Sequence, residues 1–126
     1  MINGVTEQDL VAAFKETMRR LAATVTIVTT GGAGQRSGMT ATTVISLCVD
    51  PPALLVCINR AASIHPSLSF GAKFCVNVLA SKHADLAMLF GRKAEPEVRF
   101  RTGTWSHDEH DVPFFCRCCR NTLLRC

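Results

Sequence analysis

A run of hydroxyl side chains beside a glycine is the first feature of this sequence that could bind a polar ligand. Residues 38–47 read Gly-Met-Thr-Ala-Thr-Thr-Val-Ile-Ser-Leu, with hydroxyls at Thr40, Thr42, Thr43 and Ser46. Threonine favours strands for conformational reasons, so this run alone is more typical of a strand with a solvated polar face. The alternative is a row of hydroxyl and backbone donors that faces a ligand.

The glycine-rich segment before this run matches only part of a dinucleotide fingerprint. Gly32 and Gly34 supply the first two glycines, but Ser37 stands where the third belongs. The fingerprint works by placing a pyrophosphate at a helix N-terminus, whereas a Thr-rich strand follows here. We therefore interpret residues 31–38 as a hairpin loop.

The histidines and acids do not combine into a recognisable catalytic or metal set. His107 and His110 lie among acids at 108, 109 and 111, but without the ligand spacing of a known metal site. A solvated loop is therefore the favoured interpretation. His83 is expected on an exposed helix face. No convincing catalytic triad is present.

The seven cysteines fall into two groups. Cys48, Cys57 and Cys75 lie singly in apolar runs, where cysteine behaves as a small hydrophobic residue. The other four are at positions 116, 118, 119 and 126, and their Cys-x-Cys-Cys spacing fits a zinc site poorly. The odd number and the absence of a secretory signal argue against a disulfide framework.

Apolar periodicity predicts the elements that position these residues. A helix should begin at Thr6, with Asp9 completing a capping box, and its apolar stripe should pack against a sheet. The stripe consists of Leu10, Val11, Phe14, Met18 and Leu21.

Four strands are expected, at 25–30, 39–49, 53–59 and 74–79, the third buried on both faces. A short helix over 63–70 and a helix over 82–90 capped by Ser81 complete the pattern, and residues 92–113 should be mostly irregular. Because the first three strands follow one another without helical crossovers, the order predicts a mainly β, antiparallel fold with flanking helices.

Composition excludes several classes of protein. The 126 residues are 48% hydrophobic and 19% charged, which is typical of one globular domain. The net charge of +4 is scattered, so no nucleic-acid surface is expected. No apolar run approaches the roughly 18 residues of a membrane span, and a cytoplasmic location is expected.

Five short blocks, in this order and at tight spacing, resemble the flavin reductase domain family. The segments 14–19 and 24–29 fit the same family, and the likeness runs from about Val11 to about Phe100. The blocks are Gly38–Thr43, Ser46–Pro52, Leu55–Arg60, Ser63–His65 and Phe74–Leu79.

The resemblance implies an FMN-binding split β-barrel, usually a homodimer. Such a protein would pass hydride from NADH or NADPH to FMN or FAD, and the reduced flavin would leave for a partner monooxygenase. The flavin carries that chemistry, so the protein needs to bind and orient two rings rather than supply a nucleophile.

The same resemblance suggests which residues would hold the flavin. Thr40, Ala41 and Thr42 would supply donors, and Arg60 and Ser63 would hold the phosphate. For His65, flavin contact and a simple hydrogen bond to a nearby carbonyl both stay open. The remaining candidates, at the ring edge and the groove, are Ser46, Leu47, Cys57, Ile58, Asn59, Phe90 and Arg92.

The C-terminal segment departs from the family pattern. Members continue with further strands, one carrying a Gly-Asp-His motif near the nicotinamide, whereas His110-Asp111 is reversed and lacks the glycine. We expect an incomplete barrel domain over 1–111 and an aberrant Cys- and Arg-rich tail over 112–126. A frameshifted or mispredicted reading frame is favoured over a zinc site.

This departure predicts impaired nicotinamide-dependent turnover. Two alternatives to a flavin reductase stay open. One is a flavin- or haem-binding module of the same architecture without reductase activity, and the other is a non-functional fragment.

Overall fold

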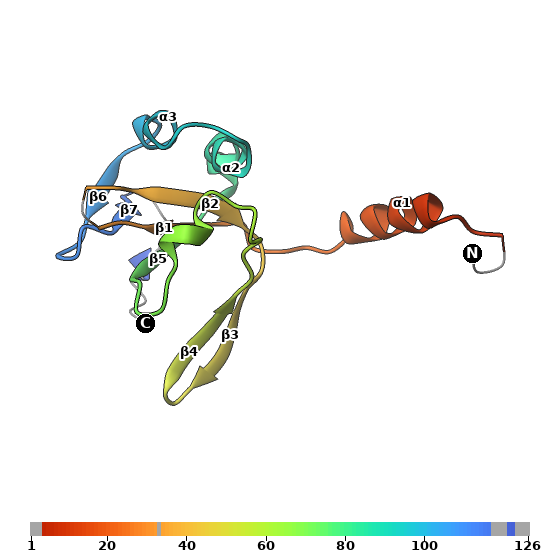
Figure 1. Ribbon diagram of the computed structural model, residues 1–126, viewed down its shortest axis with the longest axis horizontal. Coiled ribbons are helices and arrows are strands. Elements are labelled where there is room, and N and C mark those ends of the chain that lie inside the picture. Colours follow the sequence, from red (N-terminus) through yellow and green to blue (C-terminus); the bar gives the residue numbers. More distant parts are fainter. Residues whose placement is uncertain (1–3, 33, 117–120, 123–126) are drawn as a thin grey trace.

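The computed structural model describes residues 4–32, 34–116 and 121–122, and it is rich in β-strands with a few short helices (Figure 1). The helices are α1 (Glu7–Met18), α2 (Ala84–Gly91) and α3 (Pro96–Arg101), with 3-10 turns η1 (His65–Ser67) and η2 (Ser81–His83). The strands are β1 (Thr26–Thr30), β2 (Ser37–Ala41), β3 (Val44–Val49), β4 (Pro52–Val56), β5 (Phe74–Val78), β6 (Trp105–His107), β7 (Pro113–Phe115) and β8 (Asn121–Thr122).

A four-stranded antiparallel sheet in the order β2-β1-β5-β8 forms the centre of the molecule. In its register, Ile27 of β1 lies opposite Thr40 of β2 on one side and Asn77 of β5 on the other. The pairs β3–β4 and β6–β7 form two separate two-stranded sheets. The prediction of a mainly β, antiparallel fold with flanking helices is confirmed.

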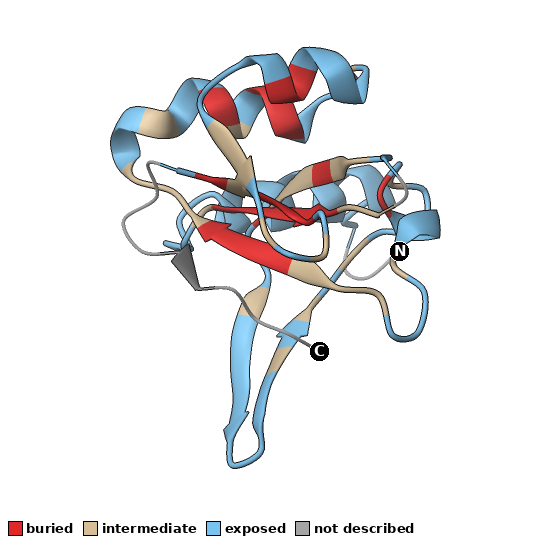
Figure 2. Ribbon diagram, turned by 90° about the vertical axis from the view of Figure 1, so that its left-hand side faces the viewer, coloured by how far each residue is buried: buried red, intermediate tan, exposed pale blue. Residues whose placement is uncertain are grey.

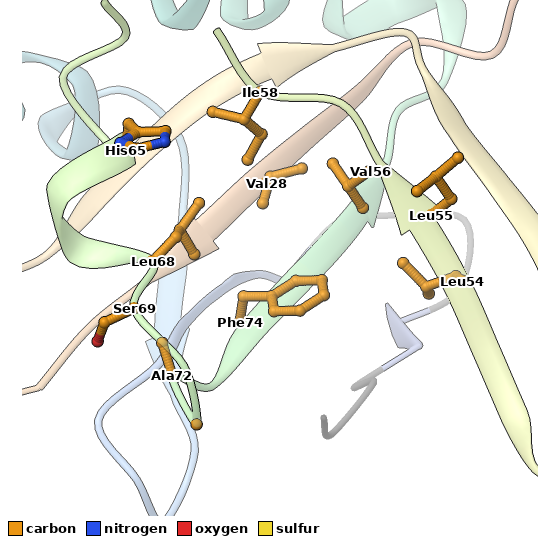
Figure 3. Close-up of a pocket in the computed structure, with 11 residues that line it drawn as sticks. Val28, Leu54, Leu55, Val56, Ile58, His65, Leu68, Ser69, Ala72 and Phe74 are labelled. Carbon is orange, nitrogen blue, oxygen red and sulfur yellow. The ribbon is translucent and has the colours of Figure 1, made fainter. Parts of the chain in front are cut away.

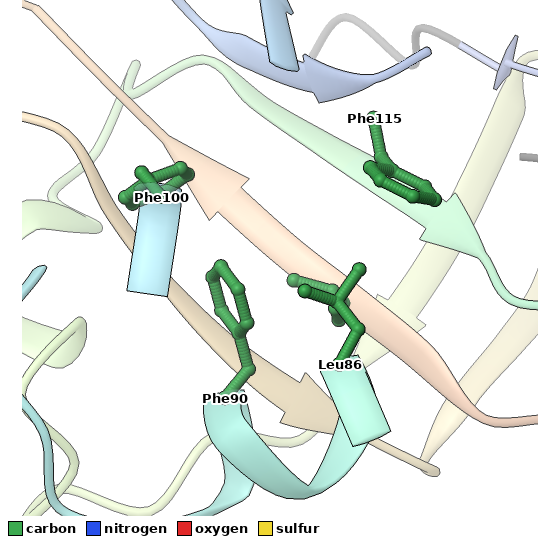
Figure 4. Close-up of a cluster of buried hydrophobic side chains, with 5 residues drawn as sticks. Leu86, Phe90, Phe100 and Phe115 are labelled. Carbon is green, nitrogen blue, oxygen red and sulfur yellow. The ribbon is translucent and has the colours of Figure 1, made fainter. Parts of the chain in front are cut away.

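Strand β1 is fully buried and contributes side chains to two hydrophobic clusters, one on each face of the sheet. This division follows from the alternation of side chains along a strand. Figure 4 shows the first cluster, which joins Ile27 to Leu86, Phe90, Phe100 and Phe115 beneath α2 and α3. The second joins Val28 to Ala41, Ile64 and Val76.

A buried hydrogen-bond network ties β7 to the central sheet. The Asn77 amide donates to the Ile27 carbonyl (2.9 Å) and to the Thr29 hydroxyl (3.1 Å). Its carbonyl oxygen accepts from the Phe115 backbone N–H (2.8 Å). The Thr29 hydroxyl in turn donates to the Pro113 carbonyl at 2.5 Å. Polar groups from three strands therefore satisfy one another inside the core.

The expected single strand over 39–49 is wrong, because the chain changes sheet within it. Strand β2 ends at Ala41, and β3 begins at Val44 in a different sheet. The expected burial of 53–59 on both faces is also wrong. The β3–β4 hairpin projects from the body, so β4 is at most half-buried (Figures 1 and 2). Strand-forming residues continue through Thr42 and Thr43, so the pattern does not reveal the change of sheet there.

Helix α1 has the predicted capping box but not the predicted packing. The Thr6 hydroxyl accepts from the Asp9 N–H, and the Asp9 carboxylate accepts from the Thr6 backbone and hydroxyl, which lowers the pKa of Asp9. The helix extends away from the body and buries no residue (Figure 1). Its apolar stripe therefore faces solvent.

Residues 92–113 are more regular than expected, since they contain α3 and β6. The rings of Phe100 and Trp105 pack edge-on, with 4.9 Å between their centroids. Both rings pack in or against the first hydrophobic cluster, so this contact holds the segment against the core. Within the predicted tail over 112–126, only 112–116 and 121–122 are described, and Phe115 belongs to the core. Cys118, Cys119 and Cys126 lie outside the described residues.

None of the helices in the described chain has the length and apolar character of a membrane span.

Candidate functional site

A hollow lies between α2, the end of β2 and the segment that leads into β1; we call it the α2 cavity. Its volume is about 800 Å³, and apolar side chains dominate its walls. Thr40 and Thr42 contribute hydroxyl groups, and Arg92 contributes a cation. The lining residues are Ala23, Thr24, Val25, Thr40, Thr42, Leu79, Ala80, Ser81, His83, Ala84, Ala87, Met88, Gly91 and Arg92.

The spacing of residues on α2 creates this space. Ala84, Ala87, Met88 and Gly91 recur at i, i+3, i+4 and i+7, so they share one helix face, and all four line the cavity. Leu86, Leu89 and Phe90 are buried in the core. Three of the four residues on the cavity face are small, and the fourth, Met88, is 74% exposed, whereas the large residues of the other face cover the sheet.

Thr40 fastens α2 to β2. Its hydroxyl donates to the Ala87 carbonyl at 2.5 Å, so the hydroxyl hydrogen is already used within the protein. The oxygen can still accept a hydrogen bond. Thr40 can therefore offer a ligand an acceptor rather than the expected donor, whereas the Thr42 side chain is exposed and its hydroxyl can rotate to do either.

A second cavity of about 610 Å³ adjoins the first and shares Thr40, Gly91 and Arg92 with it; we call it the basic cavity. Arg92, Lys93 and Arg99 contribute three cations to its lining, against one acid, Glu95. Ser63, which is distant in the sequence, adds a hydroxyl.

Arg99 is buried, at 6% exposure, and it holds the wall of the basic cavity. Its guanidinium donates to the Gly38 carbonyl (2.8 Å) and to the Arg92 carbonyl (2.5 Å), joining β2 to the α2–α3 loop. Its Nε has no hydrogen-bond partner among the described residues. Burial lowers the pKa of Arg99, and the nearby Glu95 carboxylate partly opposes that shift.

The two cavities bring together five of the thirteen predicted site residues. Thr40, Thr42 and Arg92 line the α2 cavity, and Ser63 and Phe90 join Thr40 and Arg92 at the basic cavity. Phe90 is only 1% exposed, so it serves mainly as a core residue.

The other predicted residues lie elsewhere. Ala41 is buried in the second hydrophobic cluster, and Ser46 and Leu47 are exposed on the β3–β4 hairpin. Cys57, Asn59 and Arg60 are exposed after β4, outside the linings of both cavities. The Asn59 side-chain oxygen accepts from the Ala61 N–H (2.9 Å) and so stabilises its own turn.

Ile58 and His65 line a third cavity, of about 460 Å³, between η1, β4 and β5 (Figure 3). Its walls are mainly aliphatic and aromatic, with Val28, Leu54, Val56, Leu68 and Phe74 among them. Among the described residues, no lysine or arginine lines it. It is therefore less suited to a phosphorylated ligand than the two joined cavities.

Three basic residues of the joined cavities, Arg99, Lys93 and His83, were not among the predicted ligand-binding residues. Arg99 has no distinctive signal, because an arginine near a helix end normally lies in solvent. Lys93 follows Arg92 directly and could have been inferred with it. His83 is half-buried rather than exposed as expected: its ring accepts from the Ala80 N–H (3.2 Å) and packs edge-on against Phe115.

The acidic loop around His110 is an ordered turn. The Asp108 carboxylate accepts from the backbone N–H groups of His110 and Val112, each at 2.9 Å. His110 Nε2 lies 2.8 Å from Lys73 Nζ. Within the described residues no three His, Cys, Asp or Glu side chains gather as a metal site would require.

Comparison with known proteins assigns the class. The Flavin reductase like domain model matches residues 18–121, which is most of the chain. The chain belongs to the flavin reductase-like domain family. It is 48% identical over 102 residues to FMN reductase (NADH) RutF 1 of Methylorubrum extorquens, covering 81% of this chain and 51% of that protein.

Solved structures agree with this assignment. The NADH:FAD oxidoreductase SgcE6 of Streptomyces globisporus, in complex with NAD and FAD fragments, matches with a TM-score of 0.78 at 28% identity. That match covers 90% of this chain and 67% of SgcE6. BorF, the flavin reductase component of a bacterial two-component tryptophan halogenase, matches with a TM-score of 0.74 at 29% identity, over 86% and 69%. The chain spans 51–64% of the length of the first three curated relatives.

Proposed function

We propose that this chain binds a flavin in the α2 cavity and that the flavin is reduced there by a nicotinamide nucleotide. The observation that carries the proposal is the joining of a mostly apolar cavity of about 800 Å³ to a smaller one with three cations. A volume of about 300–1,000 Å³ with a few polar groups suits a ligand of flavin size. A flat apolar ring with a phosphorylated tail needs both kinds of surface.

The residues have separate parts in this proposal. Val25, Leu79 and Ala84 would exclude water from the ring, and Thr40 and Thr42 would hydrogen-bond its polar edge. When bound, the flavin supplies the hydride chemistry, so the protein needs only to hold two rings in contact. The residues that line the cavity are suited to that task of binding and orientation.

FMN and NADH are the proposed reactants, in place of FAD and NADPH. The support is that the relatives described above are FMN reductases that use NADH, named RutF. We also propose the split-barrel architecture and, because BorF is the reductase component of a two-component halogenase, a partner flavin-dependent oxygenase or halogenase.

The proposal is tested by NADH oxidation with and without added FMN. Purified chain should oxidise NADH only when FMN is present, at a rate proportional to protein concentration. FMN binding without NADH oxidation would identify a flavin-binding module instead. If a folded sample neither binds FMN nor oxidises NADH, the proposed function is rejected.

We propose that two copies of the chain associate through the stripe on α1 and the β3–β4 hairpin. Leu10 and Phe14 on α1 are 62% and 61% exposed, and Leu47 and Val49 on the hairpin are 69% and 84% exposed. Large apolar side chains exposed together on each of two projecting elements are typical of an interaction site. A second copy fits best, because each chain offers both elements and a two-fold interface requires such self-complementarity.

The association is expected to disappear when Leu10→Glu and Phe14→Glu are combined. Two buried charges at the contact would have no partners, whereas the monomer, in which both side chains are already exposed, should stay folded. Light scattering coupled to size-exclusion chromatography reports the mass. The matched control is Ala12→Glu, a residue of the same helix outside the stripe, which should remain dimeric. A monomeric wild-type chain at high concentration would contradict the proposal.

A further inference from the structure

His83 is held in one orientation at the wall of the α2 cavity. It is the last residue of η2, directly before α2, and it is among the residues that line the cavity. Its Nδ1 accepts from the Ala80 backbone N–H at 3.2 Å, and its ring packs edge-on against Phe115, with 5.1 Å between the centroids. These two contacts restrict rotation of the ring. The imidazole is therefore a positioned group of the cavity wall.

The hydrogen bond from Ala80 decides which ring nitrogen of His83 holds the proton. A backbone N–H can only donate, so Nδ1 must be the unprotonated nitrogen of the neutral imidazole. The proton of the neutral ring is then on Nε2, which is a donor. Within the described part of the chain, no other group hydrogen-bonds to Nε2. This N–H is therefore available to a ligand in the cavity.

Reduction of a flavin changes the charge that such a donor would face. The C–H bond of the reduced nicotinamide breaks, and its hydrogen and both bonding electrons form an N–H bond on the flavin ring. The nicotinamide is left with a positive charge, and the flavin ring has gained a negative charge until a second proton arrives from solvent. Hydrogen bonds to a charged acceptor are roughly twice as strong as bonds between neutral groups. A fixed donor therefore stabilises the reduced ring more than the oxidised ring.

We propose that the Nε2–H of His83 donates a hydrogen bond to the flavin ring and favours the reduced ring over the oxidised one. The inference rests on the proposed flavin site in the α2 cavity, and it assigns a role to a residue that site has not yet used. Arg92 also lines the cavity, but it is exposed and lies where the α2 cavity meets the basic cavity. Of these two basic side chains, the structure fixes only His83 by a ring contact with the core.

The two nitrogens of His83 can be tested separately, because one contacts Ala80 and the other would contact the ligand. His83→Asn keeps a side-chain oxygen that can accept from the Ala80 N–H, but it is too short to replace the donor at Nε2. His83→Gln places an amide N–H near the position of Nε2. His107→Asn is the matched control, since His107 is exposed on β6 and lies outside the linings of both cavities.

The measured quantity is the ratio of the dissociation constants of oxidised and reduced FMN for the full chain. Oxidised FMN is titrated by its fluorescence, and FMN reduced with dithionite is titrated anaerobically by its absorbance. His83→Asn should shift the ratio about tenfold in favour of the oxidised form, because a charge-assisted hydrogen bond is lost only in the reduced complex. His83→Gln should keep most of the wild-type ratio, and His107→Asn should not change it. A purely structural role would weaken both complexes equally and leave the ratio unchanged.

Nitrogen NMR of the chain without flavin provides an independent measurement. At mildly alkaline pH, the chemical shifts of the His83 ring should show the proton on Nε2. A proton on Nδ1 would overturn the inference and leave the proposed function intact. An unchanged ratio in a folded His83→Asn variant that still binds both forms of FMN would do the same. A folded wild-type chain that binds neither form would instead reject the proposed function, and the role of His83 with it.

Discussion

Replacing Asn77 with leucine is expected to destabilise the fold by about 2–4 kcal/mol. The side chain is 1% exposed and makes three hydrogen bonds to groups on β1 and β7. Leucine is similar in size but leaves the Phe115 N–H buried without its acceptor. β7 would lose the hydrogen bond that joins its Phe115 N–H to β5. Urea denaturation followed by circular dichroism measures the loss.

Thr26→Val is the matched control, because it removes one buried hydroxyl that bonds to the Ala41 carbonyl, at 2.7 Å. Its expected cost is about 1 kcal/mol. Asn77→Leu combined with Thr29→Val should cost less than the sum of the two single changes, because both belong to one network. A loss for Asn77→Leu no larger than for Thr26→Val would contradict this account.

Filling the α2 cavity should abolish most flavin binding. Ala84 is exposed and lines the cavity, so Ala84→Trp would place an indole where the flavin ring is proposed without disturbing the core. FMN affinity should fall at least about tenfold, which corresponds to about 1.4 kcal/mol of binding free energy. The unfolding midpoint should change little, since surface substitutions are usually within about 0.5 kcal/mol. Fluorescence titration with FMN measures the affinity.

Val98→Trp serves as the control for Ala84→Trp. Val98 is 48% exposed on α3 and lies outside the linings of the α2 and basic cavities, so this substitution adds the same ring elsewhere. Its FMN affinity should match that of the wild-type chain. Equal loss in both variants, or no loss in Ala84→Trp, would mean that the flavin binds at another place.

Much of the secondary structure follows from local patterns. The Thr6–Asp9 capping box, strand β1 and strand β5 were predictable because each depends on residues within one short segment. The change of sheet at Thr42 was not, because strand propensity continues on both sides of it. The position of α1 away from the body could not be predicted either. An amphipathic stripe has the same sequence pattern whether it packs on its own chain or on another chain.

The candidate site was only partly predictable for a related reason. The α2 cavity joins residues as distant as Thr24, Thr42 and Ala84, which a sequence without coordinates does not bring together. The spacing of Ala84, Ala87, Met88 and Gly91 was available as a signal. The burial of Arg99 was not, because it depends on carbonyls of Gly38 and Arg92 that become neighbours only in the folded chain.

Equilibrium titration of the purified chain with FMN, followed by addition of NADH, tests the central claim most directly. The account predicts saturable quenching of flavin fluorescence by the wild-type chain, weakened in Ala84→Trp and unchanged in Val98→Trp. It also predicts NADH oxidation that requires FMN. A folded wild-type chain that leaves FMN fluorescence unchanged and does not oxidise NADH would contradict it.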